Sequence, residues 1–264
     1  MRVLSFLRIL KVLFGAYYSY MLEYRIEILF WMLGGFLPLI LMGVWMEAAQ
    51  TKLFDFSSIE FIRYFLSVFL VRQLTSVWVI GEFEQEVSSG TLSLRLLQPI
   101  EPVWHHFAAH LAEQATRFPF LLILLSIFFC LYPNAFWVPD FIHLILFIHN
   151  IFLAFCLRFL VQYTFALLAF WVERVSAIER FWFILYLFLS GVTAPLDVFP
   201  PLIKQIVLLT PFPYFVYFPV ALMVDLDISI FRGFLTILVW ITIFATCNRW
   251  LWRQGLKQYS AMGA

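Results

Sequence analysis

Long apolar runs separated by short polar stretches restrict the fold of this chain more than any other feature. Two clear examples are the runs Phe61–Ile80 and Phe118–Val138. About 20 consecutive, mostly apolar residues are enough for a helix to cross the hydrocarbon core of a bilayer. We therefore predict an all-α polytopic membrane protein and treat the whole chain, 1–264, as one transmembrane domain.

The composition supports this class. The chain of 264 residues is 64% hydrophobic and 12% charged, whereas soluble domains carry about 25% charged residues. Its 33 Phe and 10 Trp suit lipid contact and the membrane interfaces, so membrane lipid is an expected partner. A formal net charge of +1 argues against nucleic acid as a partner. The three cysteines are isolated in apolar runs and show no metal or redox spacing.

The apolar runs predict six membrane spans. They are Tyr24–Met46, Phe61–Ile80, Phe118–Val138, Phe141–Trp171, Ala177–Ala194 and Ile228–Trp250. The fourth run is too long for one simple crossing, so we expect it to tilt or to project beyond the bilayer.

Lys and Arg residues concentrate on the cytoplasmic side of membrane proteins, and they orient this chain. With both termini inside, eleven lie in inside segments: Arg2, Arg8, Lys11, Arg25, Arg95, Arg117, Arg174, Arg180, Arg249, Arg253 and Lys257. Four lie outside or near outer span edges: Lys52, Arg63, Lys204 and Arg232. We therefore predict that both termini and the 81–117 loop are cytoplasmic.

The first residues, 1–23, predict an amphipathic helix on the membrane surface. An apolar stripe at helical spacing is formed by Phe6, Leu10, Leu13, Phe14 and Tyr17. Arg8 and Lys11 fall on the opposite side, where they would face anionic headgroups. An ordinary anchoring extension is the alternative.

A proline-rich stretch follows the predicted fifth span. Within residues 195–227 there are six prolines in an otherwise apolar sequence: Pro195, Pro200, Pro201, Pro211, Pro213 and Pro219. Proline removes backbone donors and breaks helices, and lipid does not accept irregular backbone unless protein or water covers it. We predict a broken, re-entrant or interfacial pair of short helices on the outer face.

A short polar stretch between the second and third spans predicts a docking surface. Glu82, Glu84 and Glu86 stand at alternate positions, and Gly90 follows as a helix stop. Leucines then occupy positions 92, 94, 96 and 97 before Pro99. Exposed apolar side chains next to charged ones favour a partner that covers them.

These features resemble the permease subunit of a type-2 ATP-binding-cassette exporter, closest to a bacterial subfamily of viologen-exporter-like and uncharacterised multidrug-type systems. The resemblance rests on EVSSGTLSLRLLQPIEP at 86–102, SGVTAPLDVFP at 190–200 and PFPYFVYFP at 211–219. In that family the loop between spans two and three contacts the ATPase. The resemblance therefore assigns to that contact Glu82, Glu84, Glu86, Gly90, Leu96 and Pro99. It also implies a bacterial cytoplasmic (inner) membrane location.

The sequence contains no GxxxxGK[ST] loop for nucleotide phosphates. For an active transporter, ATP would then be bound and hydrolysed by a separate subunit, and we expect neither an enzymatic site nor a cofactor on this chain. Six spans are few to enclose a pathway, and permeases of the resembled type work in pairs. We therefore expect a second copy or a paralogue as partner.

Two other functions remain open from the sequence. One is a secondary transporter or channel that runs on an ion gradient. Such proteins tend to have inverted repeats and carboxylates near the membrane midplane, whereas the acidic residues here cluster at span borders. The other is a non-transporting scaffold that recruits a cytoplasmic partner through the same polar loop.

Four polar residues fall inside predicted spans: Arg72 and Gln73 in the second, and Arg158 and Gln162 in the fourth. Charge inside a bilayer is costly and usually has a function. In one interpretation, Arg72 and Gln73 line the translocation path. In the other, the arginines pair with neighbouring helices or extend toward the headgroups.

Three potential metal ligands share one helical face: His106, His110 and Glu113. Their spacing suits a metal site. We favour the alternative, a polar helix whose histidines are solvated against the membrane or the ATPase, and predict no metal.

Overall fold

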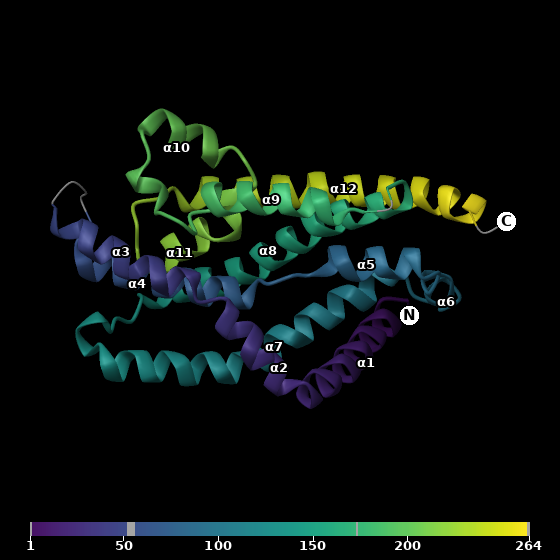
Figure 1. Cartoon of the computed structure of the whole chain (residues 1–264), viewed down its shortest axis with the longest axis horizontal. Coiled ribbons are helices and arrows are strands. Elements are labelled where there is room, and N and C mark those ends of the chain that lie inside the picture. The colour runs from purple at the N-terminus through teal and green to yellow at the C-terminus, as the bar shows by residue number, and fades with distance from the viewer. Residues whose placement is uncertain (1, 52–55, 173, 263–264) are drawn as a thin grey trace.

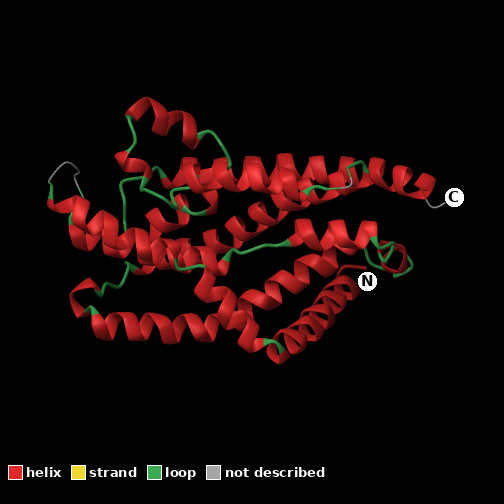
Figure 2. Cartoon of the chain, viewed as in Figure 1, coloured by secondary structure: helices red, strands yellow, loops and turns green. Residues whose placement is uncertain are grey.

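The molecule is elongated, and most of its helices follow the long axis. The computed structural model describes residues 2–51, 56–172 and 174–262, which contain helices and loops but no strand (Figures 1 and 2). The predicted all-helical class is therefore confirmed. The α-helices are α1 (Arg2–Glu23), α2 (Arg25–Gly34), α3 (Leu37–Gln50), α4 (Ser58–Leu74), α5 (Val79–Ser88), α6 (Leu92–Leu96), α7 (Pro102–Leu131), α8 (Phe141–Ala166), α9 (Ser176–Leu189), α10 (Pro201–Leu208), α11 (Tyr217–Met223) and α12 (Ile230–Met262). Short 3-10 turns are η1 (Pro133–Ala135), η2 (Leu167–Phe170), η3 (Leu196–Val198) and η4 (Phe212–Phe215).

Five stretches of the described chain are long and apolar enough to cross a bilayer. They are Arg25–Gln50, Ser58–Ser88, Pro102–Leu131, Phe141–Phe170 and Ile230–Tyr259. The predicted fifth span, Ala177–Ala194, contains α9, which has 14 residues. At about 1.5 Å per residue, α9 is about 21 Å long, less than the ~30 Å hydrocarbon core. The structure supports a multi-pass membrane protein, but the predicted count of six spans is not confirmed.

The stretch Ser58–Ser88 is broken into α4 and α5. The hydroxyls of Thr75 and Ser76 donate to the carbonyls of Val71 and Arg72, both at 2.8 Å. Such bonds compete with the helical ladder and bend helices. The predicted span Phe61–Ile80 therefore ends as a regular helix at the close of α4. The separate helix α5 continues toward the end of the molecule that holds both chain termini (Figure 1).

Helix α8 is central, with α5, α11 and α12 packed against it. Toward the end that holds α10, buried aromatic residues of α4, η4 and α11 form one apolar cluster. There the Tyr64 hydroxyl donates to the carbonyl of Gly191 at 2.7 Å. Toward the chain termini a second cluster centres on Phe83, whose ring packs edge-on against Tyr163 and Phe170. Both ends of the bundle therefore have their own core.

The proline-rich stretch 195–227 consists of short helices, as predicted. Helix α10 has 8 residues and α11 has 7. Helix α11 packs inside the bundle, because most of its side chains are buried against α4 and α8. Asp197 joins the parts of this region: it pairs with Lys204 at 2.7 Å and accepts from the Tyr217 hydroxyl at 3.0 and 3.1 Å.

Helix α1 packs along the first half of α7 (Figure 1). Of its predicted stripe, Leu10, Leu13 and Tyr17 are half-buried, whereas Arg8 and Lys11 are exposed. The Tyr17 hydroxyl lies 3.1 Å from His105 Nδ1 on α7. The helix is therefore held against the protein, and its place in the headgroup plane stays a prediction.

Close packing of α11 against α12 predicts one sharp effect of mutation. At Gly233 an added methyl group would overlap the ring of buried Phe218. We expect Gly233→Ala to destabilise the protein by about 1–3 kcal/mol, because overpacking forces side chains out of place. Thermal unfolding in detergent would show this as a melting temperature lower by several degrees, at about 2–4 °C per kcal/mol.

The matched control is Gly43→Ala in α3, where an added methyl meets nothing within 4 Å. Alanine is the better helix former by about 1 kcal/mol, so this variant should equal or exceed the wild type. Equal melting temperatures for all three proteins would contradict the close packing of α11 on α12.

Candidate functional site

Helix α5 is anchored by one apolar face. Val79, Ile80 and Phe83 are fully buried, the last among aromatic rings that include Trp252 of α12. The other face carries Glu82 and Gln85, which are exposed. An amphipathic helix of this kind has a fixed position and leaves one polar face free.

A tight turn leads from α5 into α6. Gly90 has φ +75°, a conformation that glycine adopts at little cost. After it the leucines divide: Leu92 is 0% exposed, whereas Leu94, Leu96 and Leu97 are 65%, 37% and 84% exposed. The expectation that Leu92 is exposed is therefore wrong, because its side chain anchors α6 to the body. Pro99 lies exposed just beyond α6.

The three glutamates do not form one acidic group. Glu84 turns toward the body, where its Oε2 accepts from the backbone N–H groups of Val175 (2.8 Å) and Ser176 (3.0 Å). Those N–H groups belong to the start of α9. A helix begins with N–H groups that have no partner within it, and its dipole favours negative charge there. Glu84 therefore fastens α5 to α9.

Glu82 and Glu86 both face His106 of α7. The buried imidazole places Nδ1 3.3 Å from Glu82 Oε2 and Nε2 3.3 Å from Glu86 Oε2. Only the doubly protonated ring can donate to both carboxylates. Glu86 also pairs with Arg95 of α6 at 2.8 Å. The carboxylates thus join α5, α6 and α7.

The three side chains on the helical face considered for a metal, His106, His110 and Glu113, are already bonded to other groups of the protein. His110 Nε2 accepts from the backbone N–H of Trp78 at 3.1 Å, and Glu113 pairs with Arg117. In the part of the chain that the structure describes, no group of three His, Cys, Asp or Glu side chains has the arrangement of a metal site. His106 and His110 are buried and hydrogen-bonded, not solvated as expected.

A hollow of about 470 Å³ opens between α1, α5 and α7. It is lined by Tyr17, Tyr20, Met21, Glu82, Gln85, Glu86, Ser89, Thr91, Arg95, His105, His106 and Ala109. Arg95 of α6 lines the hollow, and its sequence neighbours Leu94 and Leu96 are exposed, so the same short helix carries both charged and apolar groups.

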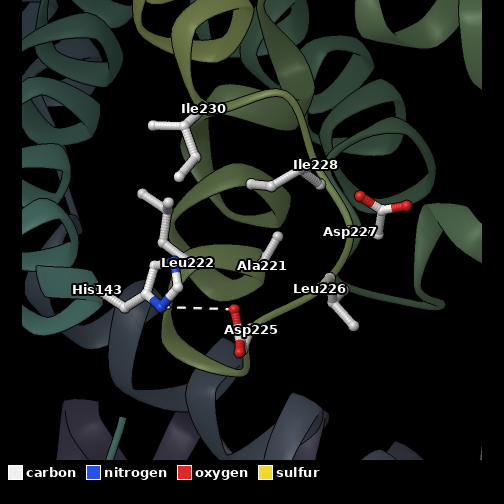
Figure 3. Close-up of a pocket in the computed structure, with 8 residues that line it drawn as sticks. All are labelled: His143, Ala221, Leu222, Asp225, Leu226, Asp227, Ile228 and Ile230. Atoms are coloured by element: carbon white, nitrogen blue, oxygen red, sulfur yellow. Dashed lines mark ion pairs between the residues drawn. The ribbon is translucent and has the colours of Figure 1, made fainter. Parts of the chain in front are cut away.

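Another pocket lies between the start of α8 and the loop that joins α11 to α12 (Figure 3). In it His143 Nδ1 is 3.4 Å from Asp225 Oδ1, as the dashed line in the figure marks. Asp225 has φ +58°, which an Asp side chain tolerates in a turn. The pocket is far along the molecule from α5, toward the opposite end (Figure 1).

The intramembrane polar residues differ in their surroundings. Gln73 is buried, donates to the Met32 carbonyl at 3.0 Å and accepts from Arg117 at 3.1 Å. These bonds tie α4 to α2 and α7 and account for its burial. Arg72 forms no hydrogen bond or ion pair through its side chain within the described ranges, and its Nη1 is buried. Arg158 hydrogen-bonds to Tyr186, with Nη1 3.4 Å from the hydroxyl, and has no other polar partner within the described ranges.

Sequence reasoning missed the roles of Glu84 and Arg117. The charge pattern places Arg117 at the end of a cytoplasmic loop, yet it is 2% exposed and donates to Gln73 and Ser76. A signal was present, because Glu113 precedes it by four residues, the spacing of a helical ion pair. For Glu84, a helix predicted over residues 79–88 would have been the signal, because it places Glu84 on a different face from Glu82 and Glu86.

Comparison with known proteins places this architecture in a family. No curated protein matches the chain. Residues 9–263 match the family model described as ABC-2 family transporter protein. The match does not address the viologen-exporter-like subfamily, which stays a prediction. Because the match covers nearly the whole sequence, the chain belongs to the ABC-2 family of transporter proteins, as its resemblance to type-2 exporters predicted.

Proposed function

We propose that this chain is the membrane-spanning permease subunit of an ATP-driven exporter, coupled to a separate ATPase subunit that binds the ATP. Membership of the ABC-2 family supports a transport role. The observation that carries the proposal is the surface of α5 and α6, where the exposed side chains of Leu94, Leu96 and Leu97 adjoin a charged network. Apolar anchors surrounded by charged groups are the make-up of a protein interface.

Movement of the docked ATPase would reach the membrane by two routes. The first is the buried ring of Phe83, which packs against Phe170 and Trp252. The second is Glu84, whose carboxylate holds the start of α9. Both contacts join α5 to other helices of the same chain. The outer face of α5 would therefore bind the partner, and its inner face would pass the movement to the bundle.

We further propose a six-span topology in a bacterial cytoplasmic membrane, with α9 as a short fifth crossing and α1 in the headgroup plane. The excess of Lys and Arg in inside segments supports cytoplasmic termini. Both termini lie at the end of the molecule that holds α5 and α6 (Figure 1). A second copy or paralogue would complete the substrate pathway, because much of the apolar surface of α9 is uncovered.

The topology can be checked by cysteine labelling. After replacement of Cys130, Cys156 and Cys247, single cysteines at Ser89 and Gln205 would each be exposed. We expect an impermeant thiol reagent added to intact cells to label Gln205→Cys but not Ser89→Cys. Lysed cells, in which both should react, are the control. Labelling of Ser89→Cys from outside would reverse the orientation.

The docking surface makes a prediction about ATPase association. Leu97→Asp and Leu96→Asp should each weaken it by about 2 kcal/mol, roughly 30-fold, because a buried apolar anchor is lost. Glu82→Gln should change it by less than about 1 kcal/mol, as expected for an exposed charge. Stoichiometry in a pull-down through the permease gives the result.

Ser93→Asp is the matched control, since it adds the same charge at an exposed position of α6 without removing an apolar group. If the ATPase binds the two leucine variants as well as it binds Ser93→Asp, α6 is not the docking element.

The Glu84 contact predicts uncoupling without loss of docking. In Glu84→Ala the N–H groups of Val175 and Ser176 lose their acceptor. The loss should destabilise the start of α9 by about 1–3 kcal/mol. Amide exchange at these two residues should then accelerate about tenfold or more. Stimulation of the ATPase in proteoliposomes should fall while its binding persists. Gln85→Ala changes an exposed neighbour and should match the wild type in both measurements. If Glu84→Ala also matches the wild type in both, the second route is refuted.

A further inference from the structure

One buried imidazole joins α5 to α7. His106 is 3% exposed, and each of its ring nitrogens is 3.3 Å from a carboxylate oxygen, one of Glu82 and one of Glu86. A neutral imidazole has one N–H group and one lone pair, so it can donate to only one carboxylate. Its bare nitrogen would then face the other carboxylate across a short distance. The contacts on both sides of the ring therefore fit the protonated form alone.

The charges around this ring balance only when it is protonated. Glu82 and Glu86 bring two negative charges, and Arg95 of α6, 2.8 Å from Glu86, brings one positive charge. Glu86 is 14% exposed, and a charge without a counter-charge is costly where water is largely excluded. A protonated His106 supplies the second positive charge. Loss of its proton leaves one carboxylate charge uncompensated.

The other ionisable groups around the ring keep their charge near neutral pH. They are Arg95 of α6, His105 and His110 of α7 and Tyr163 of α8, with Tyr17 of α1 in contact with His105. Burial lowers the pKa of His110 to about 4 and also lowers the pKa of His105. Phenols ionise only near pH 10 and guanidinium groups above about pH 12. His106 is therefore the group whose charge changes between about pH 6 and 9.

A proton can reach the ring through the hollow between α1, α5 and α7. The hollow has a volume of about 470 Å³, and Glu82, Glu86 and His106 all line it. His106 lies in the 81–117 segment, ahead of the predicted span Phe118–Val138. Burial by itself lowers the pKa of His106, but the hydrogen bonds and negative charges of Glu82 and Glu86 outweigh burial. The pKa of His106 is therefore raised above its ordinary value of 6.5.

We propose that His106, Glu82 and Glu86 form a pH-sensitive clasp, which fixes the end of α5 and the attached α6 to α7 when the ring is protonated and releases them when the proton is lost. The stabilisation is fully present below the ordinary imidazole pKa, and it is lost as the pH rises through the raised pKa of His106.

Release of the clasp would be local. Phe83 and Glu84 still anchor α5 to the body, the first by burial and the second through the backbone of Val175 and Ser176. Movement would therefore be confined to the last turns of α5 and to α6, which carries the exposed leucines of the proposed docking surface. The clasp itself stands without the proposed function, whereas control of ATPase docking by pH rests on it.

Amide hydrogen exchange in the full chain, purified in detergent, tests the clasp. The exchange rate of residues 84–96 is divided by that of a free peptide of the same sequence at the same pH. This ratio removes the direct effect of pH on exchange chemistry and leaves the protection due to structure. We expect wild-type protection to fall about tenfold or more from about pH 6 to about pH 9, because hydrogen bonds to charged groups are lost.

Variants assign the fall to His106. His106→Gln should show low protection at both pH values, and His106→Lys, charged at both, should keep high protection. The matched control is His143→Gln, which removes an imidazole that pairs with Asp225 at the opposite end of the molecule and should match the wild type. Wild-type protection that does not change with pH, or an equal fall in His106→Gln or His106→Lys, overturns the clasp. Should a His106 variant fail to fold, the wild-type comparison still decides.

The consequence for docking is measured as the affinity of the ATPase for the permease at the same two pH values. The wild-type affinity is divided by that of His106→Lys, which cancels any response of the ATPase itself. We expect this ratio to fall about tenfold between the two values, because only the ordered fraction of the surface binds. A constant ratio would refute control of docking while the exchange result keeps the clasp. A permease that binds no ATPase would refute the proposed function and leave the exchange measurement valid.

Discussion

Polar groups in the apolar interior of this protein need partners from the protein itself, and that requirement fixes which helices touch. Without water, an unpaired buried group costs several times a typical hydrogen bond. The Tyr64 hydroxyl therefore reaches across to the carbonyl of Gly191, which joins α4 to the end of α9. Gln73 donates a hydrogen bond to the Met32 carbonyl of α2 and accepts one from Arg117 of α7. Aromatic packing fills the space between helices, but these bonds determine their order around α4.

The same requirement explains why one glutamate differs from its neighbours. Residues two apart on a helix point about 200° away from each other, whereas residues four apart share a face. Glu82 and Glu86 therefore turn together toward His106, and Glu84 turns to the other side. There it satisfies backbone groups of α9 that no other side chain of the described chain reaches. The proposed docking surface is consequently poorer in free carboxylates than its sequence implies, and we expect its binding energy to come from the exposed leucines.

How far the sequence could predict this structure follows from the same argument. Apolar runs determine that the chain crosses a membrane, and the motifs near Gly90 and in the segment of residues 190–219 carry the family. Helix breaks with a chemical cause, such as the prolines of 195–227, were also predictable. The boundaries of α9 were not, because the run Phe181–Leu189 continues into the small residues 190–194 without a proline or charge, and the helix ends just before Gly191, whose φ of +87° turns the backbone. Partners distant in sequence, such as Glu84 and Ser176, become visible only in three dimensions.

Helix α9 is held to the rest of the protein at three points. Glu84 holds its start, Arg158 contacts Tyr186 in its last turn, and the carbonyl of Ser190 just beyond its end accepts from the backbone N–H of Tyr217 at 2.9 Å. Between these points little of it is buried, since Tyr186 is the one α9 residue with its side chain fully inside the chain. Segments with few buried contacts move at the lowest cost in free energy. Besides these polar contacts, α9 packs the rings of Trp182 and Tyr186 against η4. An element with so few buried contacts can shift with a limited loss of packing. In the proposed coupling, a displacement of α5 would be carried by α9 to the short helices of 195–227, while the packing of α4, α8 and α12 stays intact.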